Sequence, residues 1–196
     1  MRNLLHLFGL GVGVIFCWAF LAPEAPSQAP RKAADRRWQD STAESLKAFQ
    51  TLLKVLKDPR CLNCHPTGDR PRQGDDQHLH LFNIVRGPEN QGGPVTTCNS
   101  CHQAENNPYS QVPGAPHWGL APKSMGWYGL SDVEIGQRLV DPERNGGRTP
   151  QQLVEHMTTD DLVLWGWDPG KGRQPVQVPF EEFKTAPFSN QVSSAV

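Results

Sequence analysis

The sequence predicts a mainly α-helical, loop-rich fold that follows an apolar N-terminal segment. Helix-start signals precede apolar residues at helical spacing in three places. The 196 residues include 18 glycines and 18 prolines. Glycine and proline together make up 36 of the 196 residues, or about 18 %. This fraction exceeds the average of roughly 12 % but stays below the roughly 25–30 % that is typical of low-complexity chains. A folded chain with long connections between short helices is therefore expected.

The apolar segment, residues 1–22, is typical of an export signal, because Arg2 precedes a nearly unbroken apolar run. The run has about the minimum length of a membrane span, so an uncleaved membrane anchor is the alternative. Cys17 suggests a lipoprotein as a third interpretation, but Phe16 before it is too large for that processing. Under each interpretation the remaining chain leaves the cytoplasm, and we expect it in the periplasm, soluble or anchored to the inner membrane.

A Pro/Ala-rich tether is expected over residues 23–37, followed by the first helix. Ser41 and Glu44 form a capping box there, and Asp58 before a proline ends the helix. Apolar residues recur within it at three- and four-residue steps, at Leu46, Phe49, Leu53 and Leu56.

Two further helices are predicted in the second half of the chain. The stretches 131–134 and 149–152 are capping boxes, and the second has proline at its first helical position. A short extended piece at Val176 and Val178 precedes a last helix that begins over residues 180–183. The polar stretches between these elements are expected to be long ordered loops.

One pattern, Cys-x-x-Cys-His, occurs twice. Two thiols three positions apart can each form a thioether to one vinyl group of a single porphyrin, and the adjacent histidine can bind the iron. The sequence therefore predicts two covalently bound haem c groups, which contain iron. Their ligands are Cys61, Cys64 and His65 in the first copy, and Cys98, Cys101 and His102 in the second.

Structural zinc and disulfides are the alternatives for these cysteines. The two pairs are separated by residues 65–97, whereas zinc sites usually have roughly 15–20 residues between pairs. Neither zinc nor disulfides require a histidine after each second cysteine. A formal net charge of −1 argues against a nucleic-acid partner, and no nucleophile–base constellation stands out.

The close spacing of the motifs places both haems in one domain. A single-haem domain has on the order of a hundred residues, so the interval cannot contain a complete second copy. We expect a compact dihaem cytochrome c domain over residues 38–188 and a disordered tail over residues 189–196.

Six stretches around and after the motifs resemble a family of exported dihaem c-type cytochromes of proteobacteria. The similarity spans about residues 55–183 and implies an electron carrier. Some members are similar to companions of molybdenum hydroxylases of the isoquinoline oxidoreductase type, and the usual C-terminal helix is cut short here after Phe188. The similar stretches are His65–Asp69, Gln73–Asp76, His80–Gly87, Pro113–Trp118, Asp141–Arg148 and Leu164–Gly170.

The sixth ligand of each iron is expected from a further histidine or methionine. His80 and His156, one for each haem, are preferred, and both fall within the region of about residues 55–183 that is similar to the family. Met125 is the main rival, because it lies in a Pro-flanked loop. Other candidates lie nearby; they are His78, His117 and Met157. Two His ligands leave the reduction potential lower than His with Met.

Other residues are expected around the haems. Arg86 and Arg148 are candidates to pair with haem propionates. Aromatic residues that line the haems are expected at Trp118, Trp127, Trp165 and Trp167.

These observations predict a periplasmic electron carrier rather than an enzyme. It would relay single electrons from a dehydrogenase partner to the respiratory chain, with no catalytic residue. One alternative is a small dihaem peroxidase or reductase with one open haem. The other is a haem-bearing subunit of a larger membrane redox complex.

Overall fold

The computed structural model describes residues 29–185, with side chains from Thr42 onward. Contacts divide the chain into two units, Met1–Arg37 and Trp38–Val196. The expected leader and tail lie outside the described residues, as does Phe188. Among the helices that are described, none is both long enough and apolar enough to cross a membrane.

The first helix, α1 (Ala29–Leu56), begins earlier than its capping box predicts. Ser41 and Glu44 lie inside the helix, and the second half of the expected tether is helical. The reason is local composition, because residues 29–37 are rich in alanine, arginine and lysine, which are strong helix formers. Pro30 stands in the first turn, where its missing N–H costs no intrahelical hydrogen bond.

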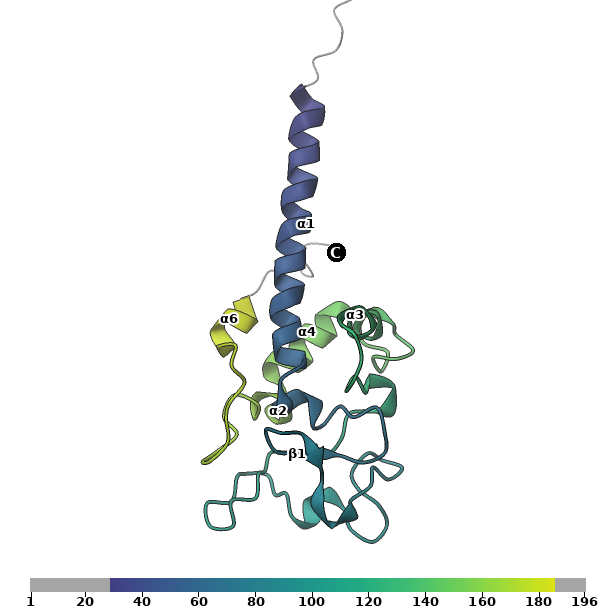
Figure 1. The fold of residues 1–196 in the computed structure, drawn as a ribbon, viewed down its shortest axis with the longest axis vertical. Coiled ribbons are helices and arrows are strands. Elements are labelled where there is room, and N and C mark those ends of the chain that lie inside the picture. The colour runs from purple at the N-terminus through teal and green to yellow at the C-terminus, as the bar shows by residue number, and fades with distance from the viewer. Residues whose placement is uncertain (1–28, 186–196) are drawn as a thin grey trace, which may run out of the picture. The chain divides into compact units, whose positions relative to one another are not determined.

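The second unit consists of short helices joined by long loops (Figure 1), so the predicted mainly α-helical, loop-rich fold is confirmed. Its helices after α1 are α2 (Pro59–Leu62), α3 (Asp132–Val140), α4 (Pro150–Thr159), α5 (Asp161–Leu164) and α6 (Phe180–Thr185). Single 3-10 turns occur at η1 (Leu81–Asn83), η2 (Cys98–Ser100) and η3 (Lys123–Met125).

A small antiparallel hairpin, which the sequence did not predict, lies in the first long loop. Strand β1 (Arg72–Gln73) pairs with β2 (His78–Leu79). Conversely, the extended piece expected at Val176 and Val178 is not a strand. Both valines are buried in the core, and the Val176 N–H donates to the Gly166 carbonyl at 2.9 Å.

Capping boxes start α3 and α4, as predicted. The Ser131 hydroxyl accepts a hydrogen bond from the Glu134 N–H, and the Glu134 carboxylate accepts one from the Ser131 N–H. Thr149 and Gln152 make the same reciprocal pair at α4. Each box satisfies two backbone donors that a helix start leaves without partners.

The hydrophobic core lies where the end of α1 meets α3 and α6 (Figure 1). Phe183 and Ile135 are almost completely buried there. Trp127 joins the core from the loop after η3, and its indole N–H donates to the Leu56 carbonyl at 2.9 Å. This contact fixes the loop against the C-terminal end of α1, directly before the first Cys-x-x-Cys-His motif.

Arg86 holds three loop segments together. Its buried guanidinium donates to the carbonyl oxygens of Pro66, Gly68 and Ala121 and to the side chain of Asn90. The sequence suggested Arg86 as a partner of haem propionates. In this fold both terminal nitrogens of its guanidinium donate within the protein, mostly to backbone carbonyl oxygens. It belongs to the framework that positions the loops.

Candidate functional site

Each Cys-x-x-Cys-His motif forms a single helical turn. The Cys64 N–H donates to the Cys61 carbonyl at 3.1 Å, and the Cys101 N–H donates to the Cys98 carbonyl at 3.2 Å. Residues three positions apart in a helical turn share one face. Both thiols of a motif therefore lie on the same side of their turn, as attachment to one planar group requires.

The first turn, α2, is well prepared by its sequence. The Asp58 carboxylate accepts a hydrogen bond from the Arg60 N–H at 2.8 Å, and Pro59 stands at the first helical position. The second turn, η2, has no side-chain cap.

The two motif histidines have matching surroundings. The Nδ1 atom of His65 donates to the Met125 carbonyl at 2.8 Å, and that of His102 donates to the Pro113 carbonyl at 2.7 Å. A carbonyl partner at Nδ1 keeps the proton there and leaves Nε2 available to a metal.

An indole ring stacks on each of these imidazoles. The centroids of His65 and Trp127 are 3.7 Å apart with an interplanar angle of 14°. Those of His102 and Trp118 are 4.4 Å apart at 5°. Since the carbonyl and the indole restrain each ring in two directions, both histidines are held in a set orientation.

Burial favours the neutral form of both motif histidines. It lowers the pKa of His65 to about 4 and also lowers the pKa of His102. Neutral imidazole is the form that binds metals. Burial also raises the pKa of Cys64 to about 11 and raises that of Cys61. Thiols in such apolar surroundings resemble buried structural cysteines rather than reactive thiolates.

The first motif lines a largely apolar cavity of about 290 Å³. His156, from α4, lines the same cavity, and its Nδ1 atom lies 3.3 Å from the Asp160 carboxylate. Apolar and aromatic residues make up much of the remaining wall. They include Val55, Leu56, Trp127, Leu139, Leu153, Trp167 and Phe183.

The second motif lines a larger cavity of about 610 Å³, together with His80. The ring centroids of His80 and His102 are 6.1 Å apart at an interplanar angle of 72°. Metal–imidazole bonds are about 2 Å long, so two imidazoles on opposite sides of one metal have centroids about 6 Å apart. The His80 Nδ1 atom donates to the Leu81 carbonyl at 2.7 Å, which leaves its Nε2 atom for a ligand.

The two cavities share part of their walls. The common residues are Arg60, Cys64, Gly119, Leu120 and Trp165. Trp165 meets Trp118 edge to face at 4.9 Å and donates its indole N–H to the Asn106 side chain at 2.9 Å. Because Trp118 also stacks on His102, aromatic side chains lead from the second motif to the shared wall.

Of the remaining candidates for the sixth ligand, three line the first cavity and one lines neither cavity. Met125 and Met157 line the first cavity, as does His117. The carbonyl of Met125 is the Nδ1 partner of His65, so its backbone lies on the side of that ring away from Nε2. His78 lines neither of the two cavities; it is exposed, and its Nδ1 atom lies 2.6 Å from the Asp76 carboxylate.

Sequence reasoning missed three charged residues at the site. Asp160 could have been predicted from the sequence. It follows His156 by four positions, and residues at that spacing are neighbours on a helix. Arg60 and Arg173 line the cavities, but no pattern distinguishes them from other arginines. Arg148, which the sequence suggested as a propionate partner, lines the first cavity.

No family model, curated protein or solved structure matches the chain. In the part of the chain that the structure describes, none of the four motif cysteines forms a disulfide. Within the described part of the chain, no three His, Cys, Asp or Glu side chains gather as ligands of one metal ion.

Proposed function

We propose that this protein is an exported dihaem c-type cytochrome that relays single electrons. One observation carries the proposal. Two adjacent cavities share a wall, and each combines a Cys-x-x-Cys-His turn with a further histidine. The sequence resemblance to exported dihaem cytochromes supports the same function.

The residues present fit two covalent haem groups. Each cavity offers two thiols on one face of a turn, an oriented neutral imidazole and an apolar lining. Cys61, Cys64 and His65 would hold the first group, and the corresponding residues of the second motif would hold the other. Bound haem supplies an iron that exchanges one electron at a time.

His156 is the preferred second axial ligand in the first cavity. The Asp160 carboxylate lies beside its Nδ1 atom, which favours a proton there and leaves Nε2 free. Met125 is less suitable, because its backbone lies on the Nδ1 side of His65. In the second cavity, the 6.1 Å between the rings of His80 and His102 supports His80 as the ligand.

Electron relay requires that the two cofactors lie close together; it does not require a catalytic residue. The shared wall keeps the two cofactor sites next to each other, and the stacked indoles and carbonyl partners orient the motif histidines. The proposed donor is a dehydrogenase, with a molybdenum hydroxylase as the example implied by the resemblance. The proposed acceptor belongs to the respiratory chain, and the location is the periplasm, soluble or anchored to the inner membrane.

Counting the haem tests this proposal. The full chain, expressed with a c-type maturation system, should show two haems c per chain in a pyridine haemochrome spectrum. The double variant Cys61→Ser/Cys64→Ser should retain one, and so should Cys98→Ser/Cys101→Ser. Chains that carry no covalent haem would contradict the proposal and favour zinc or disulfides.

Binding of carbon monoxide separates the carrier from the enzyme alternative. If both irons have two histidine ligands, the reduced protein should bind almost no carbon monoxide. Binding of one carbon monoxide per chain would indicate an open haem and favour a peroxidase or reductase.

A further inference from the structure

We propose that the buried guanidinium of Arg60 raises the reduction potentials of both haem groups and thereby couples them to one fixed charge. The inference rests on the proposed function, because it concerns the two cofactors in their cavities. Arg60 would then help to set the reduction potential of each haem group.

Arg60 occupies a position that serves both sites. It lies in α2, directly before Cys61, and its side chain is only 4 % exposed. Its side chain lines the first cavity and also the second. Among the described residues that line both cavities, Arg60 is the one that carries a charge.

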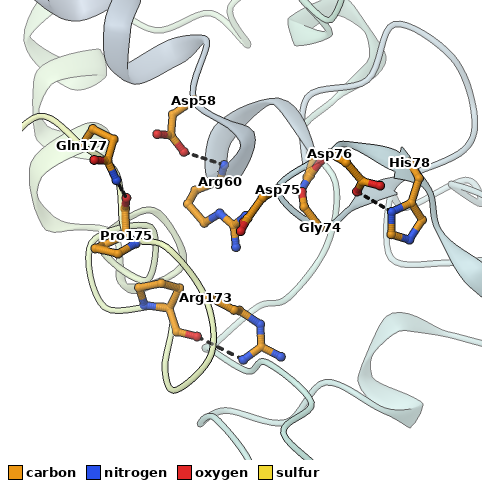
Figure 2. Close-up of polar contacts among 11 residues, drawn as sticks. Asp58, Arg60, Gly74, Asp75, Asp76, His78, Arg173, Pro175 and Gln177 are labelled. Atoms are coloured by element: carbon orange, nitrogen blue, oxygen red, sulfur yellow. Dashed lines mark hydrogen bonds and ion pairs between the residues drawn. The ribbon is translucent and has the colours of Figure 1, made fainter.

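The charge of Arg60 is only partly neutralised by its partner. The guanidinium forms an ion pair with Asp75, whose side chain is 55 % exposed (Figure 2). Water therefore screens the carboxylate, while the cation is shielded from water. The nearby Asp58 carboxylate contacts the backbone N–H of Arg60 and lines neither of the two cavities.

A positive charge near an iron disfavours the oxidised state. Oxidation adds one positive charge at the iron, and like charges repel more strongly where burial lowers the effective dielectric constant. Charge and burial are among the factors that set the reduction potentials of metal centres in proteins. Because Arg60 lies in the shared wall, its effect should reach both cofactors.

Arg173 provides a matched control. It lines the second cavity and not the first, and Figure 2 shows it near Arg60 and Asp75. It is half-buried, and its guanidinium donates to the carbonyl oxygens of Pro169 and Gln111. Neutralising Arg173 should therefore affect one cofactor, whereas neutralising Arg60 should affect two.

The test is a spectroelectrochemical titration of the full holoprotein. Haem is counted first in each variant. Arg60→Gln should shift both reduction waves to lower potential, whereas Arg60→Lys, which retains the charge, should shift them much less. Arg173→Gln should shift one wave only. Asp75→Asn removes the opposing charge without removing Arg60 and should shift both waves to higher potential.

The outcomes separate this inference from the proposed function. Unchanged waves in fully loaded Arg60→Gln, or a shift confined to one wave, would overturn the inference and leave the dihaem assignment intact. Equal shifts in Arg60→Gln and Arg60→Lys would indicate a packing effect and also overturn it. Absence of haem from the wild-type chain would instead overturn the proposed function. If Arg60→Gln does not fold, Asp75→Asn provides the test instead. A shift of its reduction waves to lower potential would then overturn the inference.

Discussion

Asp160 connects two elements through its two carboxylate oxygens. Oδ1 accepts hydrogen bonds from the N–H groups of Leu162 and Val163 at the start of α5. Oδ2 lies beside the Nδ1 atom of His156 in the first cavity. The same side chain thus caps a helix and orients a proposed axial ligand.

We predict that Asp160→Ala weakens ligation by His156 and lowers stability. The lost cap should cost about 1 kcal/mol, and the reduced holoprotein should gain carbon monoxide binding at one haem. Ser131→Ala is the control, since it removes a similar cap from α3 without touching His156. Equal carbon monoxide binding by the two variants would show that Asp160 has no orienting role.

A second prediction concerns His80. His80→Ala should convert the second haem to a form that binds one carbon monoxide per chain, because the ring facing His102 is lost. His78→Ala should retain the wild-type spectrum, since that ring is exposed and paired with Asp76. The measurement is the absorption spectrum with and without carbon monoxide. An unchanged spectrum for His80→Ala would remove His80 from the ligand set.

At the scale of the element, the capping box of α3 depends on the charge of the Glu134 carboxylate as well as on its hydrogen bonds. Hydrogen bonds from the Ser131 hydroxyl and N–H hold the pKa of Glu134 below its usual range. A depressed carboxylate pKa means that the stabilisation is complete above the ordinary pKa and is lost as the pH falls through the depressed value. The stability of this helix start therefore depends on pH in the acidic range.

We predict that Ser131→Ala lowers the free energy of unfolding by about 1 kcal/mol near neutral pH. The difference from wild type should narrow on acidification below the ordinary glutamate pKa, because protonation removes the charged acceptor. Denaturant unfolding at several pH values measures this. A difference that stays constant down to the lowest pH would exclude a contribution from the Glu134 charge.

The loop that presents His80 has an unfavourable backbone. Phe82 and Asn83 both have positive φ, at 61° and 54°, which costs of order 1–3 kcal/mol for each non-glycine residue. Phe82 also lines the second cavity, although the residue is 88 % exposed. Covering this ring with a bound porphyrin would offset part of the cost, which is consistent with a loop shaped for its cofactor.

At the scale of the whole molecule, the two cavities differ in how they meet the core. The first is lined by core residues such as Leu56, Trp127 and Phe183. The second is lined mainly by loop residues between Pro71 and Trp118. The first haem would therefore complete the core, whereas the second would mainly organise loops.

We predict that loss of the first haem destabilises the protein more than loss of the second. Cys61→Ser/Cys64→Ser should lower the Tm further than Cys98→Ser/Cys101→Ser, because it leaves apolar core surface uncovered. Thermal unfolding of both double variants, after haem has been counted, measures the difference. Equal or reversed Tm losses would contradict this account of the core.

Local sequence signals predicted the elements whose causes are local. The capping boxes at Ser131 and Thr149 were identified correctly, because each needs only residues three positions apart. The start of α1 was wrong, since the helix propensity of residues 29–37 extended the helix past the cap at Ser41. The hairpin β1–β2 was missed, because two-residue strands have too little pattern to detect.

The sequence by itself determined which side chains form the two motifs of the candidate site. Spacing alone identifies two pairs of thiols, each followed by histidine, because attachment to one flat group depends on a single turn of chain. The tertiary structure alone decided that His156 shares a cavity with the first motif and His80 with the second. It also decided that Arg60 lies between the two cavities while Arg86 serves the loops. Such placements depend on contacts between segments far apart in the chain, and no local pattern encodes them.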